Sequence, residues 1–598
     1  MAITYARRSD VPEEFTWNLG DMFPTEEAWE QELEALKTVP AQVSAMQGTL
    51  GQSGENLLAY FAMQDDITVR SRRLHTYASC KADQDTGDSR GQALRSRALA
   101  LLVSLESAAA FATPEIVAIP DETLEQFYKD VPALETYRRS IHRIRRRKGH
   151  ILSPESEQLL AAAGEMAEAP HAISSIFSNA DLSFPDVTDG QGNVHRLTNG
   201  SFVPLLESAD RTLRQKVFET YYTRLGQFKN TAAAALDAQF KQLRFFADAR
   251  KYATTRQAAL DRTEVPEAVY DALIDAVHAN LDKMYRYVAL RKKMLGVDAL
   301  HMWDVYNPIV ADAAEEISYP QAQATVLEAL AVLGEDYVAI LKEGFENRWI
   351  DVYENTGKRS GAYSTGGARP HPYVLLNHKD NLDAMFTLAH EMGHALHSYH
   401  STAAQPVSTS GYVIFVAEVA STCNEVLLMR HLLGKTTDKK QKAYLINHFL
   451  DKFKGTVYRQ TMFAEFERDM GAMAESGQPL TAEVLTARYW ELNKLYFGPD
   501  MISDEGIALE WARIPHFYYN YYVFQYATGF CAAVAIANRI LSEGASAVAD
   551  YKRFLSGGSS ADPISLLKIA GVDMSSPAPV NDALALFGQL VEELEALS

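Results

Sequence analysis

The sequence is dominated by long segments in which apolar residues recur every three or four positions. The clearest are residues 26–36, 92–111, 213–249 and 266–295, all rich in Ala, Leu, Glu, Lys and Arg. This spacing places the apolar side chains on one face of an α-helix. With 598 residues, 47% hydrophobic and 22% charged, the chain is long enough to bury a large core. The periodicity therefore predicts a mainly α-helical globular protein and excludes a disordered or fibrous one.

Strand signals are few and fall in two places. Residues 182–184 and 194–197 flank a turn-rich stretch, which predicts a β-hairpin. Residues 349–353 and 373–376 flank a Gly-rich connection, which predicts a second, small β-patch. This second patch directly precedes the segment in which the chemistry described below is concentrated.

A shift in composition near residue 200 is the clearest sign of a domain boundary. We therefore expect an N-terminal helical domain over residues 1–200 and a second helical domain over residues 201–598. The sequence shows no solenoid repeat and no low-complexity linker that would divide it further.

The charge balance disfavours two classes of partner. Lys and Arg number 57 against 77 Asp and Glu, which gives a net charge of −20. Such a chain repels nucleic-acid phosphates and anionic lipid, so neither nucleic acid nor a membrane surface is an expected partner. The most apolar stretches, residues 98–112 and 530–541, each contain a charged residue. Neither reaches the ~18–20 uncharged residues of a membrane span.

The cysteines indicate a reducing compartment. Cys80, Cys423 and Cys531 are far apart in the sequence and form no Cys-x-x-Cys pair, so neither a disulfide framework nor a thiolate zinc site is predicted. The first ten residues lack the apolar run of a secretory signal. We therefore expect a soluble, cytoplasmic protein.

Residues 387–400 read TLAHEMGHALHSYH and contain the motif HExxH. On a helix, His390 and His394 are four residues apart, so both imidazoles point to one face and can bind one Zn²⁺. Glu391 is rotated by about 100° and flanks that face, near a metal-bound water. Asp380 is a suitable N-cap for this helix. Two core histidines without a metal are the plain alternative, which is disfavoured because buried polar groups need partners.

A catalytic zinc needs a third protein ligand. His400 stands at the metzincin spacing, but that pattern needs Gly where this chain has His397. Along a continuous helix, His400 lies about 15 Å beyond His390 and is out of reach. Glu418, in an apolar stretch, is the better candidate because a lone carboxylate is rarely buried unless it is paired or binds a metal. Glu425, on the same helical face, either orients a ligand histidine or forms a salt bridge.

Residues 511–526 read WARIPHFYYNYYVFQY and form the last informative segment. Aromatic stripes usually belong to a core. Phenol and imidazole groups are also the donors that a tetrahedral oxyanion requires. Composition alone leaves both interpretations open.

Several of these segments together resemble oligoendopeptidase F, of the thimet-oligopeptidase-like (M3) family of zinc peptidases. The resemblance is carried by HEMGH at 390–394, FVAEVAST at 415–422, and HFYY at 516–519 running on to YATG. The opening FTWNLGDMFP, residues 15–24, and the ending LKIAGVDM, residues 567–574, are also similar. The resemblance therefore spans essentially the whole chain.

The resemblance implies a nearly all-helical ellipsoid split by a deep channel, with zinc on the channel floor. The β-patch beside the zinc would pair with the substrate backbone by strand addition. By position, the family's ligands for one zinc per chain correspond to His390, His394 and Glu418, and its general base corresponds to Glu391. Residues 201–598 would then form the catalytic domain.

The family's histidine and tyrosines over the substrate carbonyl correspond to His516, Tyr519 and Tyr526. In relatives named for thimet oligopeptidase a Gly-rich loop precedes the first tyrosine, whereas two residues separate His516 from Tyr519 here. The implied activity is a zinc endopeptidase that hydrolyses short, unfolded oligopeptides. In it, Glu391 takes a proton from the zinc-activated water and delivers it to the leaving amine.

Two other classes of function stay open at this point. A carboxypeptidase on a similar scaffold would need a cation for the substrate C-terminus, and Arg369 or Arg513 could supply it. A non-catalytic peptide-binding scaffold is the second alternative, but such a relative would usually lose the base, and Glu391 is present. A peptide blocked at both ends separates an endopeptidase from a carboxypeptidase.

Overall fold

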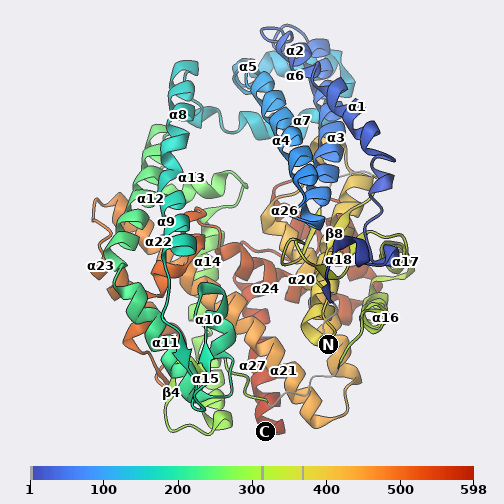
Figure 1. Cartoon of the computed structure of the whole chain (residues 1–598). Coiled ribbons are helices and arrows are strands. Elements are labelled where there is room, and N and C mark those ends of the chain that lie inside the picture. The colour runs from blue at the N-terminus through green and yellow to red at the C-terminus, as the bar shows by residue number, and fades with distance from the viewer. Residues whose placement is uncertain (1–3, 311–315, 366–369) are drawn as a thin grey trace. The chain divides into compact units, whose positions relative to one another are not determined.

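The computed structural model describes residues 4–310, 316–365 and 370–598, and most of them are helical (Figure 1). The mainly α fold that the sequence predicts is confirmed. The chain divides into two compact units. Unit 1 comprises Met1–Ile151, Ala314–His431 and Ile536–Val572, and unit 2 comprises Leu152–Ala313, Leu432–Ala535 and Asp573–Ser598. The division of the chain at residue 200 into two domains stays a prediction.

Unit 1 contains the N-terminal helices and the HExxH helix. Its helices are α1 (Glu26–Leu36), α2 (Val39–Ser44), α3 (Gly54–Gln84), α4 (Ser89–Ala109), α5 (Ala112–Ala118), α6 (Asp121–Asp130), α7 (Arg138–Arg145), α16 (Tyr319–Leu330), α17 (Glu335–Glu346), α18 (Leu382–Ala404), α19 (Val407–Ser410), α25 (Ala545–Leu555) and α26 (Pro563–Ile569), with α20 (Ile414–Lys435) as far as His431 and the end of α24 (Phe524–Glu543).

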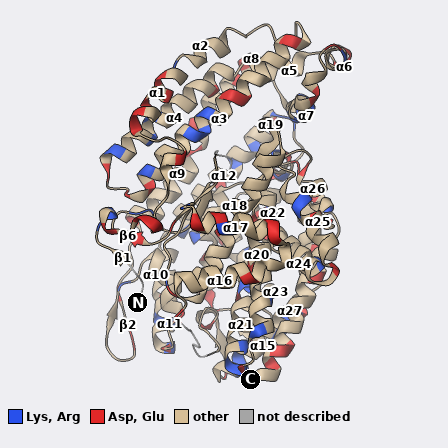
Figure 2. Ribbon diagram, turned by 90° about the vertical axis from the view of Figure 1, so that its right-hand side faces the viewer, with Lys and Arg blue, Asp and Glu red and all other residues tan. Residues whose placement is uncertain are grey.

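Unit 2 is built from a second set of helices. They are α8 (Pro154–Ala167), α9 (Ala169–Ile176), α10 (Asn199–Leu206), α11 (Arg211–Gly226), α12 (Lys229–Ala249), α13 (Thr255–Asp261), α14 (Glu267–His278), α15 (Leu281–Leu295), α21 (Lys439–Phe453), α22 (Arg459–Glu475), α23 (Ala482–Phe497) and α27 (Ala578–Leu597), together with the beginning of α24. Acidic and basic positions are interspersed along the helices (Figure 2).

Short 3₁₀ and π turns connect these helices. The 3₁₀ turns are Arg8–Asp10, Glu13–Phe15, Leu19–Asp21, Pro132–Tyr137, Lys148–His150, Met302–Asp304, Ala331–Leu333, Glu505–Arg513 and Pro515–Tyr518, and the π turns are Phe177–Asp181 and Lys454–Tyr458. Two of the 3₁₀ turns, Glu505–Arg513 and Pro515–Tyr518, carry the first part of the aromatic segment that the sequence singled out.

The long predicted helices are present, but two of them are each broken in two. Residues 26–36 are helical throughout as α1. Residues 266–295 form α14 and α15, which meet at Asn280, where the backbone leaves the helical region. The Asn280 side chain donates to the Ala276 carbonyl at 2.7 Å. This competition for a backbone carbonyl explains why a helix ends in an otherwise periodic pattern.

Within the described residues, the strands are short and pair in four small sheets. The predicted hairpin is confirmed as β2 (Val187–Thr188) antiparallel to β3 (Val194–His195), so its first strand lies a few residues later than expected. The second patch is a three-stranded sheet in the order β5 (Ile350–Asp351), β8 (Tyr373–Leu375), β7 (Tyr363–Thr365). β7 lies within the Gly-rich connection and had not been predicted.

Two further strand pairs join distant parts of the chain within a unit. β1 (Thr4–Tyr5) is parallel to β6 (Glu354–Asn355) in unit 1, and β4 (Leu300–His301) is parallel to β9 (Met501–Ile502) in unit 2. These pairs had no sequence signal, because two-residue strands are shorter than any periodic pattern.

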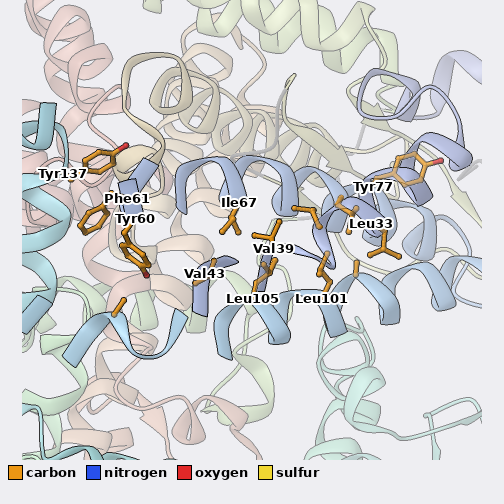
Figure 3. Close-up of a cluster of buried hydrophobic side chains, with 14 of the residues drawn as sticks. Leu33, Val39, Val43, Tyr60, Phe61, Ile67, Tyr77, Leu101, Leu105 and Tyr137 are labelled. Carbon is orange, nitrogen blue, oxygen red and sulfur yellow. The ribbon is translucent and has the colours of Figure 1, made fainter. Parts of the chain in front are cut away.

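The core of unit 1 connects the N-terminal helices to the sheet beside α18. Helices α3 and α4 run side by side and bury a cluster that includes Tyr60, Ile67 and Leu101 (Figure 3). The same cluster contains Tyr373 and Leu375 of β8. The Trp17 indole, also in this core, donates to the Val374 carbonyl at 2.7 Å. The sheet therefore has a fixed position against the helical core.

One stretch, Ser89–Ala118, is by length and composition apolar enough to cross a membrane. The sequence analysis had found no such stretch. Four of its residues, Leu94, Ala98, Leu101 and Leu105, face the core of unit 1. A single amphipathic core helix passes the same test, so this segment is weak evidence for a membrane span.

Candidate metal centre and active site

Helix α18 carries the HExxH motif and runs without interruption from Leu382 to Ala404. Its N-cap is Asn381, whose side-chain oxygen accepts a hydrogen bond from the Ala384 N–H at 2.9 Å. The predicted cap, Asp380, is one residue too early. Because the helix continues past His397, the chain does not turn back there in the way a metzincin site requires.

Gly393 allows α20 to approach α18 closely. A Cβ atom at Gly393 would lie 2.6 Å from the Ser421 Cα and 2.9 Å from the Ala420 carbonyl oxygen. The Asn424 side chain strengthens the contact by donating to the Ala389 carbonyl at 3.2 Å, and it accepts a hydrogen bond from the Tyr337 hydroxyl at 3.0 Å. The two helices are thus held together at the level of the motif.

This packing brings the three predicted metal ligands together. One donor atom from each of His390, His394 and Glu418 lies within 4.8 Å of the other two. The Glu418 Oε2 is 3.5 Å from the His390 Nε2 and 3.8 Å from the His394 Nε2. Two imidazole nitrogens and one carboxylate oxygen are a donor set that Zn²⁺ binds tetrahedrally, with the fourth position left for water or substrate. The residues present therefore fit a catalytic zinc.

Glu425 orients the first of these histidines. Its Oε1 lies 2.5 Å from the His390 Nδ1, so the Nε2 of the same ring is left for a metal. Burial disfavours the charged ring, but the hydrogen bond and charge of Glu425 outweigh it and raise the pKa of His390. Burial and the neighbouring His390 lower the pKa of His394 to about 3, which keeps it neutral. Of the two interpretations of Glu425 that the sequence left open, this contact favours the one in which Glu425 orients a ligand histidine.

Glu391 lies next to the cluster and is 6% exposed. Burial is the main cause that raises its pKa to about 7, with the Glu418 and Glu425 carboxylates adding to the effect and His390 opposing it. A bound divalent cation would lower this pKa again. A carboxylate whose pKa lies near the working pH can both accept and return a proton.

His400 lies outside the cluster. Its ring is parallel to that of Tyr337, with centroids 6.1 Å apart. Its Nε2 has no hydrogen-bond partner within the described part of the chain. The unbroken α18 explains this placement, because His400 follows His390 by almost three helical turns.

The cluster opens into a cavity of about 690 Å³ within unit 1. Tyr363 and Ser364 of β7 form part of its wall, and so does Tyr412, which the sequence analysis missed. The Tyr412 hydroxyl lies 2.7 Å from the Ser398 hydroxyl, and its ring stacks on His397 at 3.8 Å between centroids. Tyr412 lies in the stretch between the two site helices α18 and α20, to which the sequence analysis assigned no function.

The aromatic segment lies in unit 2, where it forms a cluster of rings. The His516 ring lies 5.4 Å from that of Tyr519 and 5.9 Å from that of Tyr526, both edge-on, and Tyr522 packs against Tyr526. Tyr519 is 44% exposed. Burial, with a smaller contribution from the charge of Arg459, lowers the pKa of His516. The three predicted residues are therefore brought together, and Tyr522 is added to them.

A strained turn shapes this segment. Asn520 and Tyr521 both have positive φ, 57° and 59°, a conformation that costs energy outside glycine. The fully buried Glu467 accepts the Tyr521 N–H at 2.6 Å, and Gln239 donates to the Asn520 side chain at 2.9 Å. Burial raises the pKa of Glu467 to about 8. Neither residue had been predicted, because each lies far from the segment in sequence.

Of the two cations considered for a carboxypeptidase, Arg513 does not border the cavity. Arg513 lies in unit 2, where it pairs with Glu510 at 2.5 Å. Arg369 lies outside the described residues. The cavity in unit 1 instead contains Arg72, a residue of α3 that the sequence analysis did not consider.

Comparisons with known proteins identify the family of this chain. The profile described as Peptidase family M3 matches residues 204–586, and that described as Oligopeptidase F matches residues 115–184. Oligopeptidase PepF of Bacillus subtilis (strain 168) is 46% identical over 590 residues, covering 99% of this chain and 88% of the relative. Oligoendopeptidase F, plasmid, of Lactococcus lactis subsp. cremoris is 40% identical over 591 residues, covering 99% and 98%.

Solved structures show the same fold. A crystal structure from Chlamydophila abortus has a TM-score of 0.92 at 33% identity and covers 100% of both chains. Oligoendopeptidase-F from Enterococcus faecium has a TM-score of 0.75 at 38% identity, covering 96% of this chain and 99% of that one.

A helical fold in which an HExxH helix is joined by a third candidate ligand, a carboxylate on a neighbouring helix, is typical of a metallopeptidase, and the oligoendopeptidase relatives indicate a metalloendopeptidase. The profile matches and the relatives are consistent with that class. The chain belongs to peptidase family M3, and the relatives named here are its oligopeptidase F members.

Proposed function

We propose that this chain is a zinc endopeptidase that cleaves short, unfolded oligopeptides. The observation that carries the proposal is the convergence of His390, His394 and Glu418 beside the buried Glu391 in one cavity. These three residues would hold one zinc ion, which when bound polarises water and the scissile carbonyl. The names of the relatives, oligopeptidase and oligoendopeptidase, support peptide substrates.

In this proposal Glu391 accepts a proton from the attacking water and returns it to the leaving amine. Glu425 keeps His390 in the orientation that a metal ligand needs, through the hydrogen bond at Nδ1. Tyr519 and Tyr526, with His516, donate hydrogen bonds to the carbonyl oxygen as negative charge develops on it. The clustering of these three rings supports the last assignment.

We further propose that the substrate backbone adds to the sheet at β7. In the order β5-β8-β7 this strand lies at the edge, and its outer side pairs with no described strand. Tyr363 and Ser364 of the strand line the cavity. An exposed strand edge beside a catalytic centre binds an extended peptide through main-chain hydrogen bonds. A cytoplasmic location also stays a prediction, which the three unpaired, buried cysteines support.

The test combines metal analysis with a blocked peptide. Zinc-loaded protein should contain about one zinc per chain and should cleave an internally quenched peptide that is blocked at both ends. Glu391→Gln should keep zinc and fold but lose about 10²–10⁴-fold in turnover, because an amide cannot accept the proton. An active preparation without metal, or a Glu391→Gln protein with full activity, would refute the mechanism. Cleavage only of peptides with a free C-terminus would favour the carboxypeptidase.

A further inference from the structure

Arg72, on α3, borders the cavity that contains the candidate metal cluster. It shares the lining of this cavity with His390, Glu391 and Glu418, and all four residues belong to unit 1. No other Arg or Lys contributes to the wall within the part of the chain that the structure describes. Its Nη2 lies 3.8 Å from the position that a Cβ of Gly411 would occupy, so the guanidinium reaches the connection between α19 and α20.

The guanidinium of Arg72 has no acidic partner. Among residues 4–310, 316–365 and 370–598, no carboxylate oxygen lies within 4.0 Å of it. Its neighbours on the same helix have other contacts: Arg70 pairs with Glu32 at 2.7 Å, and the Arg73 guanidinium lies over the Phe23 ring at 5.0 Å. A guanidinium stays charged in proteins. The side chain of Arg72 is exposed, so its charge is accessible to an anion that enters the cavity.

The position of Arg72 in the wall of the cavity indicates which kind of anion it would bind. The substrates of this cavity are peptides, and the anionic groups of a peptide are carboxylates. The planar guanidinium binds a carboxylate with two parallel hydrogen bonds, which gives both energy and orientation. The whole chain carries a net charge of −20, which repels an acidic peptide at long range. Arg72 gives such a peptide a local attraction from a side chain in the wall of the cavity.

We propose that Arg72 binds a carboxylate of the peptide substrate and makes the enzyme select peptides that carry one near the scissile bond. The inference rests on the proposed function. The carboxylate comes either from an acidic side chain or from a free C-terminus, and both present the same two oxygens to the guanidinium. Arg72 is in this view a specificity residue, which acts on the choice of peptide rather than on proton transfer.

The experiment measures kcat/KM for a family of internally quenched peptides. In one arm, a single Glu or its isostere Gln is moved through the positions on each side of the cleaved bond, with both ends blocked. In the other arm, a neutral peptide is compared with free and amidated C-termini. The proteins are the wild type, Arg72→Gln, Arg72→Lys and the control Arg70→Gln, which removes the same charge two residues away on α3 and does not border the cavity.

The wild type should prefer the carboxylate peptide by about tenfold or more at one position or at the C-terminus, as expected for a charge-assisted hydrogen bond. This ratio should fall to near one in Arg72→Gln, recover in part in Arg72→Lys and stay unchanged in Arg70→Gln. The arm that shows the preference identifies the source of the carboxylate. A wild type without any preference, or an Arg72→Gln protein that keeps it, would overturn the inference.

A binding measurement separates this inference from the proposed mechanism. Glu391→Gln protein, with and without Arg72→Gln, is titrated calorimetrically with the Glu and Gln peptides. A lower Kd for the Glu peptide that is lost in Arg72→Gln supports the inference. Failure of the zinc-loaded wild type to cleave the neutral peptide would refute the proposed function alone and would leave this binding result standing. Equal Kd values for both peptides in both proteins would overturn the role of Arg72.

Discussion

The contact at Gly393 makes a quantitative prediction about the metal centre. A methyl group placed there by Gly393→Ala would lie 2.6 Å from the Ser421 Cα and 2.9 Å from the Ala420 oxygen. Ordinary contacts between such atoms are about 3.5–4.0 Å, so α20 must move away from α18 by about 1 Å. Both clashing atoms belong to backbone, and no side-chain rotation can relieve them.

The stability change is the difference between two opposing effects. Alanine is a better helix former than glycine by about 1 kcal/mol, whereas overpacking costs about 1–3 kcal/mol. We therefore expect the free energy of unfolding of the apo protein to fall by about 0–2 kcal/mol. The effect on the metal is larger, because Glu418 lies one helical turn before Ser421 and moves with it. A ligand distance of about 2.0–2.2 Å tolerates roughly 0.2 Å, far less than the expected shift.

Zinc affinity should fall by at least 10–100-fold, the range seen when ligand geometry is disturbed through a neighbour. The assay is competition for zinc with a chromophoric chelator, combined with thermal unfolding of the apo protein. Gly434→Ala is the matched control, since it lies in the same helix α20 and a Cβ there would meet no atom within 4 Å. If Gly393→Ala binds zinc as tightly as Gly434→Ala does, the role assigned to helix contact is wrong.

Three further outcomes test other parts of the site. Glu418→Ala should lose zinc whereas His400→Ala should keep it, as measured by metal analysis; loss only with His400→Ala would indicate a metzincin-like site. Tyr519→Phe should lower kcat by about 10²–10³-fold with little change in KM, because an oxyanion donor acts in the transition state. Neither Tyr518→Phe nor Tyr521→Phe is a neutral control, because the first hydroxyl bonds to Ser174 and the second pairs with Thr255 at 2.7 Å. Glu467→Gln should become more stable relative to the wild type as the pH rises from about 4.5 to 8. Over this range the unfolded wild-type chain ionises Glu467, whereas the folded protein keeps the carboxyl protonated. The free energy of unfolding of the wild type therefore falls by about 1.4 kcal/mol per pH unit, and that of the Gln variant does not. A difference in Tm that does not change with pH would show that Glu467 is not held protonated.

The sequence by itself determined the parts of this protein that depend on local periodicity. Helix α1 begins and ends where the apolar spacing predicts. The i, i+4 spacing of His390 and His394 places both rings on one face of any helix. An isolated carboxylate in an apolar stretch pointed to Glu418, because burying a charge needs a compensating partner. The resemblance to a known family added the roles of Glu391 and of the aromatic segment.

The tertiary structure alone decided which distant residues meet. Gly393 is an ordinary glycine in the sequence, and only the packing of α20 shows that no larger residue fits there. Glu467 and Arg72 carry no motif. Glu467 matters because it accepts an N–H of a strained turn, and Arg72 matters because it borders a cavity. β7 is too short for a periodic signal and exists because β8 offers it an edge. Contacts between elements far apart in sequence depend on side-chain shape and on which polar groups remain unpaired, and local sequence patterns do not encode these.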